Sequence, residues 1–485
     1  ALIVLAKFIS ITYPQVLRDL KRGTCVAFVC LLWGIAFLDK HSNPNGIARK
    51  LKHIRHDRMQ NLRKDPYLTA TTIMLELFQQ ALTLMTTTPY HQTMLILDDV
   101  LIPKPFAKLI QGAYWDHDHA LDKPCFGIRV VVLLYSNQTF AIPVAFLIWH
   151  KKQNPMPDFA PRRHRSKNEL ARILVYWVYR KGLRFCVLTF DAWYAKEENL
   201  MLFNRLGILW VTALAPNRWI RLPLETPRKN PRGKPTTHEK LRCEDLSARY
   251  PRRGQYSNYP ALGFRAKAFY IELTPKVGSL KLVVVKDFIK SQAFQKEAQL
   301  SNIALNAALT KPKKKPKGRH PHKYLLTNSL DASVAWIIRC YQTRWEIEWT
   351  FRESKQHFAL GACSAVKFDA VTQHISLCFL GFVSLQQLRI NAKASAKTIP
   401  PYEVKDNLTL GGYRRELQQL YQLRTHESVY LVNLSEQCEP VDHILADIFS
   451  NNVLSNAEHQ AKYDKLLDNA EEDKSLSYLD MLTAA

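Results

Sequence analysis

Short apolar runs of strand length fill the stretch between residues 94 and 213, and they constrain the fold more than any other feature. Polar or turn-forming residues separate the runs, and one helix is predicted among them at about residues 167–180. The predicted strands are 94–97, 128–135, 140–149, 185–190 and 206–213. Strands arranged around a helix in this order predict a mixed α/β sheet.

The charge of the chain is large and uneven. The 485 residues carry a net charge of +26. From Asn391 onward there are 9 Lys and Arg against 15 Asp and Glu, so the first 390 residues hold 59 against 27, a net of +32. A basic body of this size indicates a polyanionic partner, most plausibly nucleic acid.

Composition changes along the chain predict five regions. In residues 1–89, two short cationic helices at 47–54 and 56–63 have the size of a helix-turn-helix, although an ordinary helical hairpin has the same pattern. Turn formers and cations dominate residues 216–327, where 265–273 and 280–286 are strand candidates. The predicted regions are an N-terminal helical DNA-binding domain, 1–89; the first part of an α/β domain, 90–215; a β-rich basic insertion, 216–327; the second part of the α/β domain, 328–392; and an acidic, helical C-terminal region, 393–485.

The cysteine usage favours a reducing compartment. The nine cysteines contain no C-x-x-C pair, and most lie in apolar runs, where a thiol packs as a small hydrophobe. The longest apolar run, 24–38, is short for a membrane span. We therefore expect a cytoplasmic protein without a membrane segment.

A helix is predicted over residues 341–355, because no Gly or Pro interrupts strong helix formers. At about 100° per residue, Tyr341, Arg344, Glu348 and Lys355 fall on one narrow face, and other acids of the run point away from it. An acid flanked by cations suits a site that holds both a metal ion and phosphates. A solvated surface with ion pairs has the same pattern.

Further acids follow two predicted strands. Asp98 and Asp99 come after 94–97, and Asp191 comes after 185–190. An Asp at such a position is more often a turn or helix cap. Together with Glu348, however, carboxylates from two strands and a helix can hold two divalent cations, which cleave phosphodiesters. Mg²⁺ suits such an oxygen-rich site.

One polar cluster, 115–119, has the residue types of a metal site but not the expected geometry. Adjacent residues on an extended chain point to opposite faces, so the sequence Trp-Asp-His-Asp-His predicts a polar loop.

The helix residues fit the signature Y-x2-R-x3-E-x6-K, and the chain resembles the bacterial insertion-sequence transposases of the Asp-Asp-Glu class that carry it. The runs 97–104 and 189–194 resemble the two acidic motifs of that family. Its catalytic Asp commonly precedes a Thr, which assigns Asp99; Val100 occupies the Thr position here, so Asp98 remains open.

The resemblance implies a ribonuclease H-like mixed sheet with flanking helices, interrupted by the β-rich insertion. It implies that Asp99, Asp191 and Glu348 hold two Mg²⁺ ions, with Mn²⁺ as a substitute. It also implies that Tyr341, Arg344 and Lys355 contact DNA, and that a homodimer pairs two transposon ends. The implied activity is cleavage at those ends and transfer of the 3′ hydroxyl to target DNA. A catalytically inactive DNA-binding descendant and a nuclease without strand transfer are the alternatives.

Overall fold

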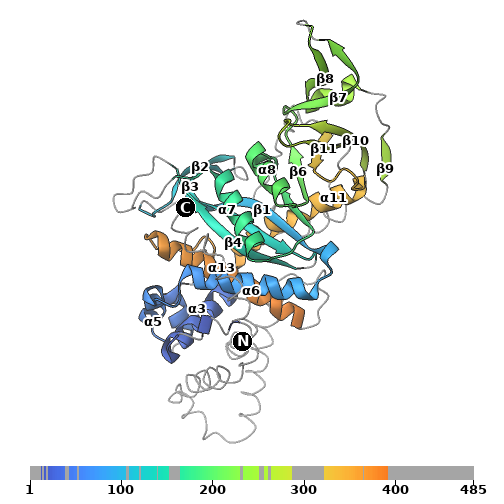
Figure 1. The fold of residues 1–485 in the computed structure, drawn as a ribbon. Coiled ribbons are helices and arrows are strands. Elements are labelled where there is room, and N and C mark those ends of the chain that lie inside the picture. Colours follow the sequence, from blue (N-terminus) through green and yellow to red (C-terminus); the bar gives the residue numbers. More distant parts are fainter. Residues whose placement is uncertain are drawn as a thin grey trace, which may run out of the picture. The chain divides into compact units, whose positions relative to one another are not determined.

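The structure is a computed structural model, and it forms two compact units (Figure 1). The first unit comprises Ala1–Thr93, Asp98–Arg184 and Glu346–Ala485, and the second comprises Met94–Leu97 and Phe185–Trp345. The structure describes residues 13, 16–17, 20–38, 43–51, 54–104, 109–118, 122–138, 140–151, 164–229, 233–250, 256–259, 264–286, 322–363 and 365–391. The predicted acidic region 393–485 lies outside these residues.

Helices from both ends of the described chain pack together in the first unit. The long helix α13 (Phe368–Asn391) contacts α3 (Arg22–Phe37) and α6 (Ala70–Thr87). By length and composition one helix of the described residues, Phe368–Gln387 within α13, could cross a membrane, but 83% of its apolar window is buried inside the protein. The short elements between α3 and α6 are α4 (Pro44–Leu51), α5 (His56–Asn61) and a 3₁₀ turn, Leu62–Lys64.

The first unit also contains antiparallel strands. A 3₁₀ turn, Tyr90–Gln92, precedes β1 (Met94–Pro103), and β2 (Tyr114–Asp118), β3 (Lys123–Ser136) and β4 (Ala141–Trp149) follow it. Strand β3 pairs antiparallel with β2 and β4. Both α6 and α7 (Lys167–Arg180) contact β4, and every residue of this strand except Trp149 is buried. The prediction of α7 is confirmed; a capping box between Ser166 and Glu169 begins it.

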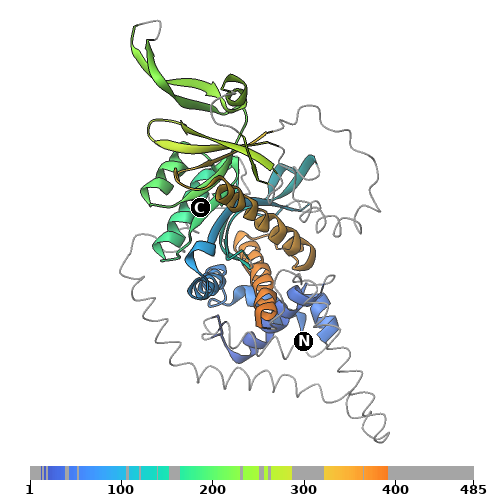
Figure 2. The ribbon, with the colours of Figure 1, turned by 90° about the vertical axis from the view of Figure 1, so that its right-hand side faces the viewer.

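The second unit is built around a sheet with the strand order β1-β5-β6-β12-β11-β10-β7-β8, with β9 paired to β10. Among the strand pairs whose register the structure describes, β1–β5 and β5–β6 are parallel. The strands are β5 (Val187–Phe190), β6 (Trp210–Leu214), β7 (Trp219–Lys229), β8 (Pro235–Arg242), β9 (Ser257–Tyr259), β10 (Phe264–Glu272), β11 (Ser279–Lys286) and β12 (His322–Thr327). Figure 2 shows the β7–β8 ribbon in green. The predicted mixed sheet with flanking helices is confirmed, and most of its strands are antiparallel.

Helices and short turns complete the second unit. They are a 3₁₀ turn (Ala192–Tyr194), α8 (Glu197–Arg205), a second 3₁₀ turn (Cys243–Asp245), α9 (Leu246–Arg249) and α11 (Val334–Thr343). Residues of α11 pack into an apolar core with β6, β10, β11 and β12, and Tyr341 is one of them. The core of this unit therefore lies between the sheet and α11.

The helix predicted over 341–355 is interrupted. α11 ends at Thr343, and α12 (Trp345–His357) begins after Arg344. The Arg344 N–H bonds to the Tyr341 carbonyl, three residues earlier, at 3.2 Å, so the helix tightens there. The division between the two units falls directly after Trp345. Residues 341–355 therefore contribute to a helix in each of the two units. Their unbroken run of helix formers does not reveal this division.

Candidate active site

Strands β1 and β5 present acids at matching positions. They run parallel, and the last paired residues are Leu97 and Phe190. The next residue along the chain is an acid in both places: Asp98 lies within β1, Asp191 directly follows β5, and both are half-buried. Asp191 is the N-cap of a 3₁₀ turn but makes no capping bond with its side chain. Asp191 therefore does not make the side-chain hydrogen bond that a capping role requires.

Asp99 has a different environment. Its side chain is 8% exposed and lies between two cations. Arg129 Nη1 is 2.9 Å from Oδ2, and Lys167 Nζ is 3.1 Å from Oδ1. Successive strand residues point to opposite faces, and Asp98 Oδ1 accepts a hydrogen bond from the Asp99 backbone N–H at 2.8 Å. A metal ion at Asp99 would have to compete with both cations.

Arg129 connects Asp99 to a second acid. Its Nε and Nη2 donate to Asp116 Oδ2 at 2.8 and 2.5 Å, and Tyr114 Oη donates to the same oxygen at 3.1 Å. Burial alone would lower the pKa of Arg129, but Asp99 and Asp116 hold it above its usual value. Burial alone would raise the pKa of Asp116, and Arg129 holds it below the usual range. We call Asp99, Arg129, Asp116 and Lys167 the anchor cluster.

The first part of α12 carries Glu348 in its first turn, where it is half-buried. The two neighbouring acids of the helix lie elsewhere: Glu353 is buried, and Glu346 accepts a hydrogen bond from Ser136. Burial raises the pKa of Glu346 to about 7, although the Ser136 hydrogen bond opposes the shift. The three glutamates of one helix therefore occupy three environments.

The predicted DNA-contacting residues differ in exposure. Tyr341 is 1% exposed, and its ring lies 4.6 Å from Lys323 Nζ and 5.6 Å from the Arg344 guanidinium. Arg344 is also buried, and its guanidinium lies 5.7 Å from the Trp345 ring. A ring this buried offers no face to a base in this structure. In this structure the Tyr341 ring contacts the side-chain cations of Lys323 and Arg344.

Lys355 is exposed as a residue, but its ammonium lies among other side chains. Desolvation lowers the pKa of Lys355; nearby Asp118 opposes the shift and Arg129 adds to it. This cation belongs to the same unit as the anchor cluster and Glu348.

The predicted metal ligands do not form a preassembled cluster. Asp98, Asp99 and Glu348 belong to the first unit and Asp191 to the second. Among the residues that the structure describes, no three His, Cys, Asp or Glu side chains gather as a metal site requires. The donor set itself, carboxylates within β1, directly after β5 and on α12, has the chemistry that Mg²⁺ prefers. Asp99 fits a metal ion poorly, because both of its oxygens are bound by cations.

Sequence reasoning missed most of the anchor cluster. Arg129 is a single cation inside the apolar run of β3, and a buried cation is nearly always paired, so the signal was present. The prediction of a polar loop at 115–119 is wrong for most of its length, because Tyr114–Asp118 form the edge strand β2.

Part of the chain is similar to a known protein family. Residues 15–255 match the family described as DDE superfamily endonuclease. The match supports a DDE transposase-type family, and the mixed sheet is consistent with an α/β nuclease-like fold. It indicates a nuclease-type enzyme with DNA as substrate, in a family that generally uses divalent metal ions. The matched range includes Asp98, Asp99 and Asp191 and ends before Glu348. No curated protein was found to match the chain.

Proposed function

We propose that this protein is a Mg²⁺-dependent DNA transposase that cleaves transposon ends and joins the freed 3′ hydroxyl to target DNA. One observation supports this most strongly: Asp98 and Asp191 directly follow paired residues of two parallel strands. The endonuclease family match over 15–255 and the Y-R-E-K signature around Glu348 support it independently. The corresponding domain is ribonuclease H-like, with 216–327 as its insertion.

We further propose that Asp98, Asp191 and Glu348 hold the metal ions, with Asp99 as the alternative first ligand. The ions would activate the attacking oxygen and stabilise the leaving oxygen during in-line displacement. Asp99 then has another role: its bonds to Arg129 and Lys167 fix the middle of β1 and orient the acid that precedes it. We therefore propose Asp98 as the first metal ligand, whereas the family's Asp-Thr pattern alone assigns Asp99.

Arg344, which lies between α11 and α12, and Lys355 of α12 are suited to phosphate oxygens. Arg344 presents a planar fork of donors, whereas Lys355 presents a point charge. Tyr341 supports the Arg344 guanidinium through its ring rather than contacting a base. Removal of the Tyr341 ring would therefore act on DNA binding through Arg344.

Recognition of the transposon end is assigned to α4 and α5, and synapsis to a homodimer. Arg49 and Lys50 in the last turn of α4 are exposed, as a phosphate contact requires.

The test uses the purified full chain, Mg²⁺ and DNA that carries the element's ends. Asp191→Ala and Glu348→Ala should each reduce end cleavage by about a thousandfold, because metal catalysis supplies several kcal/mol and each 1.4 kcal/mol is tenfold. DNA binding should be retained, which an electrophoretic shift measures. Variants that cleave as fast as the wild type would show that these acids are not ligands.

A further inference from the structure

The segment that contains α7 is strongly cationic. From His164 to Arg184 the chain carries six Lys and Arg residues against one acid, Glu169, which leaves a net charge of +5. The helix contacts β3 and β4, and its apolar side chains, such as Leu174 and Val178, are buried. The positive charge is therefore concentrated on the part of α7 that does not pack on the sheet.

The helical repeat places arginines and tyrosines together on this outward face. At about 100° per residue, Arg172, Tyr176 and Tyr179 lie within about 60° of one another, and Arg180 lies about 40° beyond Tyr176. All four are half-buried or exposed, and Tyr179 is 41% exposed, whereas Leu174 on the opposite side is buried. We call Arg172, Tyr176, Tyr179 and Arg180 the α7 band.

The α7 band matches the backbone of duplex DNA in spacing and in donor types. Arg172 and Arg180 are eight residues apart, a rise of about 12 Å, and the major groove of B-DNA is about 12 Å wide. Tyrosine hydroxyls, like arginines, bind phosphate oxygens in protein–DNA complexes. The guanidinium of Arg180 lies 5.9 Å from the centroid of the Tyr176 ring, within cation–π range, so the ring helps to hold this cation in the band.

Glu169 can offset only a small part of this charge. Its carboxylate accepts a hydrogen bond from the Ser166 backbone N–H at 2.7 Å, as part of the capping box that begins α7. This bond and the nearby charges of Arg172 and Arg165 hold the pKa of Glu169 below its usual range, although burial opposes the shift. One carboxylate therefore serves the start of the helix and two arginines.

The start of α7 lies beside a proposed metal ligand. Lys167, in the first turn, points away from the α7 band and bonds to Asp99 at 3.1 Å. The backbone N–H of Asp99 in turn bonds to Asp98. These residues and the whole of α7 belong to the first unit. A duplex lying along α7 would therefore extend from the neighbourhood of Asp98.

We propose that the α7 band binds the backbone of duplex target DNA. This role of α7 rests on the proposed function, in which the protein holds the element's end and a target at the same time. Phosphate contacts position a duplex without reading its sequence, so they suit a target, whereas an element's end must be read through its bases. The α7 band is separate from α4 and α5, to which recognition of the end is assigned.

The experiment first saturates the full chain with unlabelled end DNA, without Mg²⁺ so that no strand is cut, and then adds a labelled duplex of unrelated sequence. Fluorescence anisotropy at several salt concentrations measures the affinity for the labelled duplex. Arg172→Ala combined with Arg180→Ala should weaken this affinity roughly tenfold in physiological salt. It should also reduce the dependence of log affinity on log salt by about two ions. The affinity for end DNA, measured separately, should fall several-fold less.

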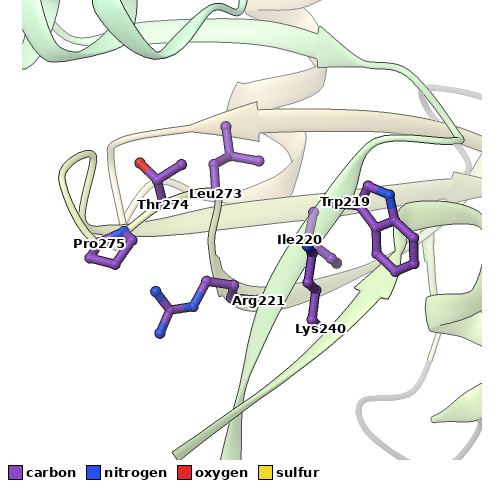
Figure 3. Close-up of a pocket in the computed structure, with 7 residues that line it drawn as sticks. All are labelled: Trp219, Ile220, Arg221, Lys240, Leu273, Thr274 and Pro275. Atoms are coloured by element: carbon purple, nitrogen blue, oxygen red, sulfur yellow. The ribbon is translucent and has the colours of Figure 1, made fainter.

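A charge-conserving variant and a matched control separate phosphate binding from other effects. Arg172→Lys combined with Arg180→Lys should keep most of the affinity, because phosphate also binds the point charge of lysine. The control is Arg221→Ala combined with Lys240→Ala, which also removes two positive charges. Both residues belong to the second unit, where they line a pocket of about 210 Å³ (Figure 3). This control should bind the labelled duplex nearly as the wild type does.

The results separate the α7 band from the proposed function. If the Arg172→Ala, Arg180→Ala variant binds the labelled duplex as the wild type does, the α7 band is not a target surface. An equal loss for end DNA, or an equal loss in the Arg221→Ala, Lys240→Ala control, would overturn it as well. Each of these results leaves the proposed function intact, provided that the wild type cleaves end DNA when Mg²⁺ is added. A wild type that never cleaves end DNA would contradict the proposed function instead.

Discussion

At the scale of single residues, the adjacent acids Asp98 and Asp99 have different environments. Asp98 follows the register pair Leu97–Phe190, whereas Asp99 is held by Arg129 and Lys167. Breaking a buried ion pair leaves an uncompensated charge, which costs roughly 3–5 kcal/mol. Substitution of Asp99 should thus affect folding first, and substitution of Asp98 should affect chemistry first.

We therefore predict a separation between Asp98→Asn and Asp99→Asn. Asp98→Asn should abolish end cleavage with a nearly unchanged denaturation midpoint. Asp99→Asn should lower the midpoint and retain measurable cleavage by the folded fraction. Urea denaturation and a cleavage assay on the same preparations measure both. A stable, inactive Asp99→Asn beside a fully active Asp98→Asn would return the metal ligand to Asp99.

Glu76 on α6 should make stability depend on pH. It is 2% exposed, and burial raises its pKa to about 8, although a hydrogen bond from Gln80 opposes the shift. The folded state then keeps a proton that the unfolded state loses above about pH 4.5. The free energy of unfolding from this residue therefore falls as the pH rises from about 4.5 to about 8, and it is constant above that.

Glu76→Gln should remove this dependence. The variant should gain stability relative to the wild type at pH 8 and show little difference at pH 5, as measured by urea denaturation at both pH values. Other titrating groups cancel in the comparison of the two proteins. An equal difference at both pH values would show that the carboxyl is not protonated in the folded state.

At the scale of secondary-structure elements, the features that could be predicted are those that depend on neighbouring residues in the sequence. The bounds of α7, β10 and β11 follow from periodicity, and Asp191 follows β5 as predicted. The prediction that Asp98 and Asp99 come after a strand is wrong, because both lie inside β1, which continues to Pro103. The break at Arg344 and the pairing of Asp99 with Arg129, thirty residues apart, depend on which core each segment joins. Tertiary packing decides such features, and a sequence window does not contain it.

The N-terminal helices illustrate the same point for experimental design. α3 and α6 pack on α13, so removal of residues 1–89 would uncover the core of the first unit. Point substitution is the cleaner test of DNA recognition. Arg49→Ala with Lys50→Ala should weaken binding to the element's end several-fold more than binding to unrelated duplex. Equal loss on both DNAs would mean that α4 contributes only nonspecific charge.

At the scale of the whole molecule, the proposed metal ligands are divided between the two units. Asp191 belongs to one, and Asp98 and Glu348 belong to the other. The chain passes from one unit to the other at four places, which lie directly after Thr93, Leu97, Arg184 and Trp345. Two of these crossings, after Leu97 and after Trp345, fall within three residues of a proposed ligand.

We propose above all that this chain joins DNA as well as cutting it. The most direct measurement follows a labelled 3′ end of the element in the presence of full-length protein, Mg²⁺ and unlabelled target DNA. The label should first be released from flanking DNA and then appear covalently in the target, and chelation of Mg²⁺ should prevent both. Release without joining would identify a nuclease, and binding without release would identify a DNA-binding protein; either result would contradict the proposed transposase.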